Sequence, residues 1–109
     1  MDLFSVTDRW GDQIVLTEED WDRIVAKRLE IAPYRDEIRQ TLEKPNAVWE
    51  GGWVDTKVFY AKDLVTDHPF RGCYVAVAVR YTSKPASIRT AYLSINMAAN
   101  LGKLLHFDR

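Results

Sequence analysis

Cysteine, histidine and glycine-rich motifs are scarce in this 109-residue sequence. The single cysteine, Cys73, excludes a disulfide within the chain and is read as a small buried side chain. The two histidines, His68 and His106, share no metal-ligand spacing with it. No phosphate-binding glycine motif is present, and Gly51-Gly52 is predicted to be a hairpin turn. We therefore expect neither a metal site nor a bound cofactor.

Long apolar runs and an excess of charge are also missing. The longest apolar run, Cys73–Val79, is far shorter than the roughly 20 residues that a membrane-spanning helix needs. Residues 1–10 lack the basic and apolar regions of a signal peptide, so a cytoplasmic chain with no membrane partner is expected. The formal net charge of −1 argues against a broad nucleic-acid-coating surface, but it leaves room for a small cationic site.

The length and composition predict one domain that spans residues 1–109. Hydrophobic residues make up 47% of the chain and charged residues 28%, and both values are ordinary for a globular protein. No linker, internal repeat or low-complexity segment divides the sequence.

The first part of the chain predicts two helices. Thr17 is a suitable N-cap, three acidic residues follow it, and an apolar stripe predicts a helix over 18–30. Pro33 suits the first turn of a second helix, which the pattern ends near Lys44 because Pro45 disfavours helical angles in the residue before it.

The rest of the chain predicts strands over 47–50, 53–61, 72–81 and 88–95. Residues 96–109 fit either a helical stripe or an edge strand. The fold class is therefore α+β, with two N-terminal helices packed on one face of a four- to five-stranded, mainly antiparallel sheet.

Alternation along the strands predicts two different sheet faces. Val75, Val77 and Val79 belong under the helices, whereas Ala76, Ala78 and Arg80 belong to the other face. Thr90 and Tyr92 are expected on that second face, with Lys62 or Lys57 at its rim. Small side chains below a cationic and hydroxyl rim suit a phosphodiester. A solvated polar face without function fits the same pattern.

Other cations and one histidine are open to two interpretations. Arg23 and Lys27 lie four residues apart on the first helix, beside Arg28, and they mark either a solvated face or a contact surface. His68 lies in a predicted loop, and histidine is the residue type whose ordinary pKa suits proton transfer near neutral pH. A lone histidine in a loop is, however, more often simply exposed.

Five stretches carry a resemblance to a known family: Val15–Ile24, Ile38–Val48, Val58–Lys62, Tyr74–Val79 and Ile88–Tyr92. In order and spacing they resemble the barnase–EndoU–colicin–RelE-like nucleases of phage and toxin proteins, over residues 14–95. The most specific piece is the closing motif Ile-x-Thr-Ala-Tyr. The resemblance implies a toxin-type, metal-independent endoribonuclease that cleaves RNA by attack of a ribose 2′-hydroxyl on the phosphodiester, with a protein antitoxin as a second partner.

The resemblance also implies roles for single residues. Thr90 and Tyr92 match the closing motif, Arg80 falls on the strand before it, and Tyr60 and Lys62 match the aromatic-basic end of the hairpin strand. These five are the catalytic candidates. The RNA-binding candidates are Arg23, Lys27, Arg28, Arg89 and Lys57.

The sequence departs from the family at Arg23 and Arg28, where members often carry histidine. Arginine stays protonated near neutral pH and cannot serve as an ordinary base. The acid–base role is therefore open among Tyr60, Tyr92, Lys62 and His68.

Two alternatives to catalysis follow, one from this departure and the near-neutral charge and one from the apolar stripe of the C-terminal segment. The first is a catalytically inactive RNA- or protein-binding regulatory domain on the same scaffold. The second is a scaffold that self-associates through residues 97–109.

Overall fold

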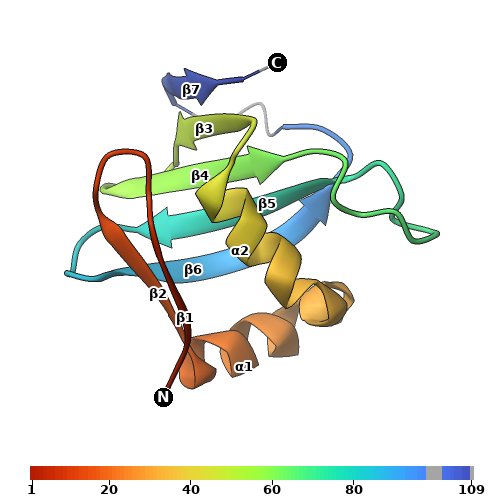
Figure 1. The fold of residues 1–109 in the computed structure, drawn as a ribbon, viewed down its shortest axis with the longest axis horizontal. Helices are drawn as coiled ribbons and strands as arrows, with labels where there is room; N and C mark the ends of the chain where they lie inside the picture. The colour runs from red at the N-terminus through yellow and green to blue at the C-terminus, as the bar shows by residue number, and fades with distance from the viewer. Residues whose placement is uncertain (98–101, 109) are drawn as a thin grey trace.

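The structure is a computed structural model that describes residues 1–97 and 102–108. It contains one seven-stranded mixed sheet with the strand order β1-β2-β6-β5-β4-β3-β7, in which β2 and β6 are parallel and the other neighbours are antiparallel (Figure 1). The strands are β1 Asp2–Thr7, β2 Gln13–Thr17, β3 Ala47–Glu50, β4 Thr56–Ala61, β5 Tyr74–Arg80, β6 Ala86–Ser94 and β7 Leu104–Phe107. The α+β class is confirmed.

The predicted number of strands, four to five, is wrong. An N-terminal hairpin of β1 and β2 precedes the helices, and its turn contains Gly11 at a φ of 91°. The sequence indicated a short apolar stretch at 14–16 but no partner for it, because Asp2–Thr7 lacks a clear apolar alternation. The seventh strand, β7, is formed by the C-terminal segment and pairs with β3.

The two helices are shorter than the sequence predicts. Helix α1 (Glu18–Lys27) starts at the predicted cap, where the Asp20 amide donates to Thr17 Oγ1 at 3.1 Å. A 3-10 helix, η1 (Leu29–Tyr34), follows and contains Pro33, so this proline does not open helix α2 (Arg35–Glu43). The tighter turn places Ile31 and Tyr34 in the core, and their burial offsets its poorer hydrogen bonding.

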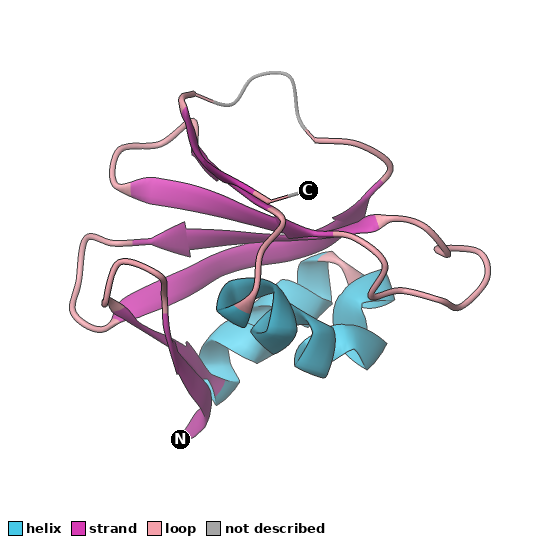
Figure 2. Cartoon of the chain, turned by 45° about the horizontal axis from the view of Figure 1, so that its top comes forward, coloured by secondary structure: helices cyan, strands magenta, loops and turns pink. Residues whose placement is uncertain are grey.

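Both helices lie on one side of the sheet (Figure 2). The main core lies between the helices and the sheet and includes Ile24 and Ile38 of the helices. Val75, Val77 and Val79 of β5 also belong to it, as the alternation along β5 predicts. Helix α1 lies along the outer edge of β6, beyond the short parallel pairing of β2 with Ala86 and Ser87. This edge becomes important for the site described below.

The far side of the sheet is not the open, alanine-floored surface that the sequence predicts. Ala76 is fully buried and Ala78 is 7% exposed. A second apolar cluster covers them, formed by Ala47, Val58 and Tyr60 with Trp49, Tyr74, Tyr92 and Met97 packed against it. Aromatic side chains fill this face because each covers more of the small-residue floor than an aliphatic side chain could.

The C-terminal segment adopts the second of its two expected forms, an edge strand. Residues 98–101 and 109 of the predicted self-association segment lie outside the described residues. In the described part, His106 of β7 is hydrogen-bonded to Arg9 Nη1 at 3.0 Å. Every described helix is too short or too polar to cross a lipid bilayer.

Candidate nucleic-acid interface

A β-bulge in β6 creates the starting point of the candidate site. Ala78 pairs with Thr90 and Val79 pairs with Ile88, so Arg89 is an extra residue in the ladder. A bulge leaves backbone groups without their regular partners. Strand β2 has already ended its pairing at Ser87, so the outer edge of the bulge faces α1.

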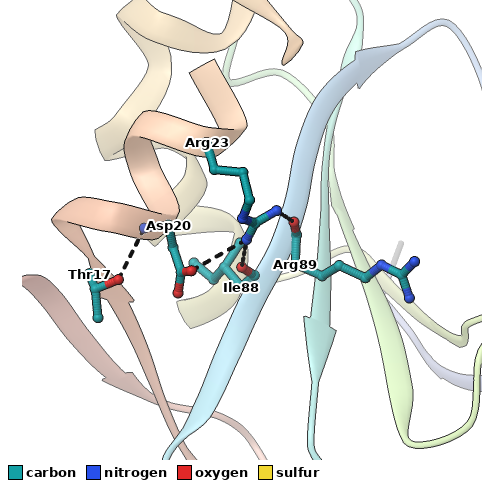
Figure 3. Close-up of polar contacts among 5 residues, drawn as sticks. All are labelled: Thr17, Asp20, Arg23, Ile88 and Arg89. Atoms are coloured by element: carbon teal, nitrogen blue, oxygen red, sulfur yellow. Dashed lines mark hydrogen bonds and ion pairs between the residues drawn. The ribbon is translucent and has the colours of Figure 1, made fainter. Parts of the chain in front are cut away.

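Arg23 of α1 satisfies this irregular edge. Its Nη1 donates to the Arg89 carbonyl at 2.7 Å, and its Nη2 donates to the Ile88 carbonyl at 3.3 Å (Figure 3). The same Nη2 is 3.4 Å from Asp20 Oδ1. The planar guanidinium suits two neighbouring acceptors. Arg23 is therefore primarily a structural cation that fixes the helix to the strand.

Two adjoining pockets open around this junction, each of about 410 Å³. Arg23, Lys27 and Arg89 line both of them. Arg80, Ser87 and Asp20 complete one pocket, and Arg28 and Thr90 help to form the other. We call the cations of these pockets, Arg23, Lys27, Arg28, Arg80 and Arg89, the α1–β6 basic site.

The charge of this site is almost uncompensated. In the described residues, Arg23 forms an ion pair with Asp20, whereas no carboxylate forms one with the other four cations. Lys27, Arg28 and Arg80 are exposed, so the guanidinium of Arg80 is not held in a buried ion pair. A group of neighbouring cations without acidic partners favours an anionic ligand.

Two of the cations lie over aromatic rings. The Arg28 Cζ atom is 5.0 Å from the centre of the Tyr92 ring, and the Arg89 Cζ atom is 4.5 Å from the centre of the Trp53 ring. Figure 3 shows the Arg89 side chain extending away from Arg23. Both distances are short enough for cation–π attraction, so the rings orient the two guanidinium groups. Neither group has an ion-pair partner among residues 1–97 and 102–108.

The two tyrosines of the predicted site lie in buried surroundings, and that of Tyr92 keeps its phenol protonated near neutral pH. Burial, followed by a hydrogen bond with Tyr60, raises the pKa of Tyr92 above its ordinary value of 10. Tyr60 itself is fully buried and packs edge-on against Tyr74. Both tyrosines lie beside Ala76 of β5 in the ladder, with Tyr92 of β6 next to the basic site and Tyr60 of β4 two strands further away.

Three other predicted residues do not join the site. Lys57 faces the helix side of the sheet, where its Nζ lies 3.8 Å from the Trp10 ring centre and 4.5 Å from that of Tyr81. Lys62 follows the far end of β4, because Thr56 rather than Ala61 pairs with Arg80. His68 is exposed in the loop between β4 and β5, beyond the end of β5 opposite to Arg80.

Two residues of the site region were missed by sequence reasoning. Asp20 was read as a helix-start residue, yet it also lines the pocket that contains Arg80. Trp53 was assigned to a strand, but β4 begins at Thr56 and the indole is 66% exposed in the loop before it. The large apolar side chain directly after Gly51-Gly52 was the available signal, because a turn is a poor place to bury tryptophan.

Comparison with known proteins assigns no family to the chain. No protein-family model matches the chain, and neither a curated protein nor a solved structure matches it. Among residues 1–97 and 102–108, no three histidine, cysteine or acidic side chains are grouped to hold a metal ion.

Proposed function

We propose that this chain binds the phosphodiester backbone of RNA through the α1–β6 basic site. The observation that carries the proposal is the meeting of Lys27, Arg28, Arg80 and Arg89 around adjoining pockets without an acidic partner among the described residues. Binding cationic side chains to phosphates releases condensed counterions, which provides most of the sequence-independent affinity for nucleic acid.

The hydroxyl groups of the pockets support an RNA ligand. Ser87 lines the first pocket and Thr90 the second, and each is partly exposed. Serine and threonine hydroxyls bond to phosphate and sugar oxygens alongside arginine and lysine. The resemblance of the sequence to ribonuclease-type domains favours RNA over DNA.

A second candidate function is RNA cleavage at the same site, by 2′-hydroxyl attack without a metal ion. It is favoured by the position of Arg80 and Thr90, two residues of the resemblance, in the adjoining pockets. The 2′-oxygen bonds to phosphorus as the bond from phosphorus to the 5′-oxygen breaks, and the departing 5′-oxygen takes a proton from solvent water. The reaction also needs a proton acceptor for the attacking hydroxyl. Asp20 is the carboxylate that lines the Arg80 pocket, so it takes this role in the proposal. The cations would stabilise the charge that develops on the phosphorane.

One experiment tests both functions. Labelled single-stranded RNA is incubated with folded protein in the presence of a chelator, and both the bound fraction and the RNA length are measured. Arg80→Ala should weaken binding, whereas Lys44→Ala, which removes an exposed lysine at the end of α2, should not. Cleavage is supported if the wild-type protein shortens the RNA and the Asp20→Asn protein does not. Binding alone is supported if the wild-type protein binds the RNA and leaves its length unchanged. Absence of RNA binding by the wild-type protein would reject both.

A further inference from the structure

We propose that Trp53 is a stacking platform for one unpaired nucleobase, so that the RNA taken by the α1–β6 basic site is single-stranded. This inference rests on the proposed function and adds the class of RNA. Base stacking on an exposed aromatic ring next to a cationic groove is the common physical basis of single-strand binding.

The ring of Trp53 is oriented toward the basic site by Arg89. The guanidinium carbon of Arg89 is 4.5 Å from the ring centre, while 66% of the tryptophan remains exposed. The cation–aromatic contact at Trp10 is different. The Trp10 ring packs edge-on against buried Phe59, and Lys57 Nζ lies 3.8 Å from its centre. Trp10 thus has a packing role, whereas most of Trp53 lacks one.

The loop that carries Trp53 is anchored to the strand that carries Arg80. The Gly51 amide donates to the Thr56 carbonyl at 2.8 Å, and the Thr56 amide donates to the Trp53 carbonyl at 3.2 Å. The Tyr81 amide, directly after Arg80, donates to the Asp55 carbonyl at 2.7 Å. These bonds hold the backbone of the loop beside the strand that carries Arg80, and a preorganised site loses less entropy on binding.

A hollow beside the ring has the size that a nucleotide needs. Trp53 lines a cavity of about 610 Å³, within the roughly 300–1,000 Å³ of small-ligand pockets. Glu50 and Asp55 line the same hollow. Carboxylates repel phosphate but accept hydrogen bonds from the amino groups of bases. Lys57 also lines this hollow, but three carboxylates, those of Asp12, Glu50 and Asp55, outnumber it. Charge therefore favours the base in this hollow and the phosphate at the α1–β6 basic site.

A paired strand cannot use this arrangement, because its bases are stacked on one another and their edges are occupied. The platform therefore predicts that Trp53 contributes to binding of single-stranded RNA and contributes little to binding of a duplex or of a ligand that carries phosphate alone.

The test compares three probes: a labelled 12-nucleotide RNA, the same RNA as a duplex, and inorganic polyphosphate. Trp53→Ala should weaken binding of the single strand about 5- to 150-fold, the range that corresponds to about 1–3 kcal/mol of base stacking. It should leave polyphosphate and duplex binding within about twofold of the wild-type protein. Trp53→Phe should restore most of the single-strand affinity because it keeps an aromatic face.

Ile95→Ala is the matched control, since Ile95 is a large apolar side chain that is 84% exposed and follows the end of β6, outside both the hollow beside Trp53 and the pockets of the basic site. It should bind all three probes as the wild-type protein does. Thermal unfolding of each variant establishes that the fold is retained, as expected for exposed side chains in a loop.

The outcomes separate the two proposals. If Trp53→Ala binds the single strand as tightly as the wild-type protein while Arg80→Ala weakens binding of all three probes, the platform is wrong and RNA-backbone binding stands. Equal weakening of all three probes by Trp53→Ala also overturns the platform. If the wild-type protein binds none of the probes, the proposed function fails and the platform fails with it.

Discussion

Arg23 illustrates at the scale of one residue how a cation can have a structural role inside the proposed binding site. Its guanidinium donates to the carbonyls of Ile88 and Arg89 and contacts Asp20, whereas neighbouring Lys27 forms no ion pair among the described residues. The sequence suggested a similar role for both, because they lie four residues apart on one helix. The hydrogen bonds of Arg23 to two backbone carbonyls give it a structural role, whereas exposed Lys27 is left for a ligand in the proposed function.

Arg23→Ala should lower the free energy of unfolding by about 1–3 kcal/mol, because it leaves the bulge carbonyls without their donor. Arg23→Lys should recover only part of the loss, since an ammonium group lacks the planar fork. Lys27→Ala should change stability by less than about 0.5 kcal/mol but weaken RNA binding. Urea denaturation of the three variants measures this difference, and equal stability of Arg23→Ala and Lys27→Ala would contradict the structural role.

The pKa values of three tyrosines set the behaviour of the protein in alkali: that of Tyr34, which burial raises, and those of the pair Tyr92 and Tyr81. Burial raises both, and it is assisted by hydrogen bonds, with Tyr60 for Tyr92 and with Asp8 for Tyr81. The folded state therefore keeps protons that the unfolded state loses above pH 10, so the associated stability is complete below pH 10 and declines as pH rises. Neither side chain is a phenolate near neutral pH.

Absorbance at the phenolate band should show three tyrosines, Tyr34, Tyr81 and Tyr92, titrating later than an exposed tyrosine and only as the protein unfolds. Tyr92→Phe should remove one of these late transitions and make the loss of stability above pH 10 shallower. Denaturant unfolding at pH 8, 10 and 11 measures the same effect from the stability side. Titration of all tyrosines near pH 10 in folded protein would contradict the assigned environments.

At the scale of elements, local signals predicted what local interactions decide. The cap at Thr17, the apolar faces of α1 and α2 and the valines of β5 all lie as the sequence indicated. The N-terminal hairpin was missed although its own pairing is local, because Asp2–Thr7 lacks a clear apolar alternation. The place of β2 beside β6 could not be predicted either, since the two strands lie more than 60 residues apart in the chain. The end of α1 and the position of Pro33 were also misjudged, because tertiary burial of η1 overrides helical propensity.

The bulge in β6 explains which part of the site could be predicted. Thr90 and Tyr92 follow simple alternation and lie on the expected face, but Ile88 is in the helix-side core together with Ala91, three residues later. Such spacing is possible only because Arg89 is an extra residue. Alternation alone could not place Arg23 at this bulge, nor show that aromatic side chains cover Ala76 and Ala78.

Gly51 provides a test of the loop that carries Trp53. An added Cβ at Gly51 would lie 2.8 Å from the Thr56 side chain, whereas one at Gly52 would meet no atom within 4 Å. Thr56 is buried, so the clash is not easily relieved. Gly51→Ala should therefore destabilise the protein by about 1–3 kcal/mol, as overpacking does.

Gly52→Ala is the matched control for this loop, and it should stay within about 0.5 kcal/mol of the wild-type free energy of unfolding. Thermal or urea unfolding distinguishes the two variants. A Gly51→Ala protein as stable as Gly52→Ala would show that the turn is looser than the close approach of Thr56 indicates.

At the scale of the whole molecule, charge is separated although the total is small. The chain has a formal net charge of −1, yet five cations and one acidic residue line the two pockets between α1 and β6. Acidic side chains gather elsewhere, as in the hollow lined by Asp12, Glu50 and Asp55. The composition argued against a broad cationic surface and left room for a small one, and only the packing of α1 against β6 shows which cations lie together.

The salt dependence of RNA binding tests the central claim, the α1–β6 basic site, most directly. The logarithm of the association constant is measured against the logarithm of salt concentration for the wild-type protein, Lys27→Ala, Arg80→Ala and the double variant. Each substitution should reduce the slope by about 0.7, the value expected for one phosphate contact on a single strand. Parallel lines for all four proteins, or an affinity that does not change with salt, would contradict the claim.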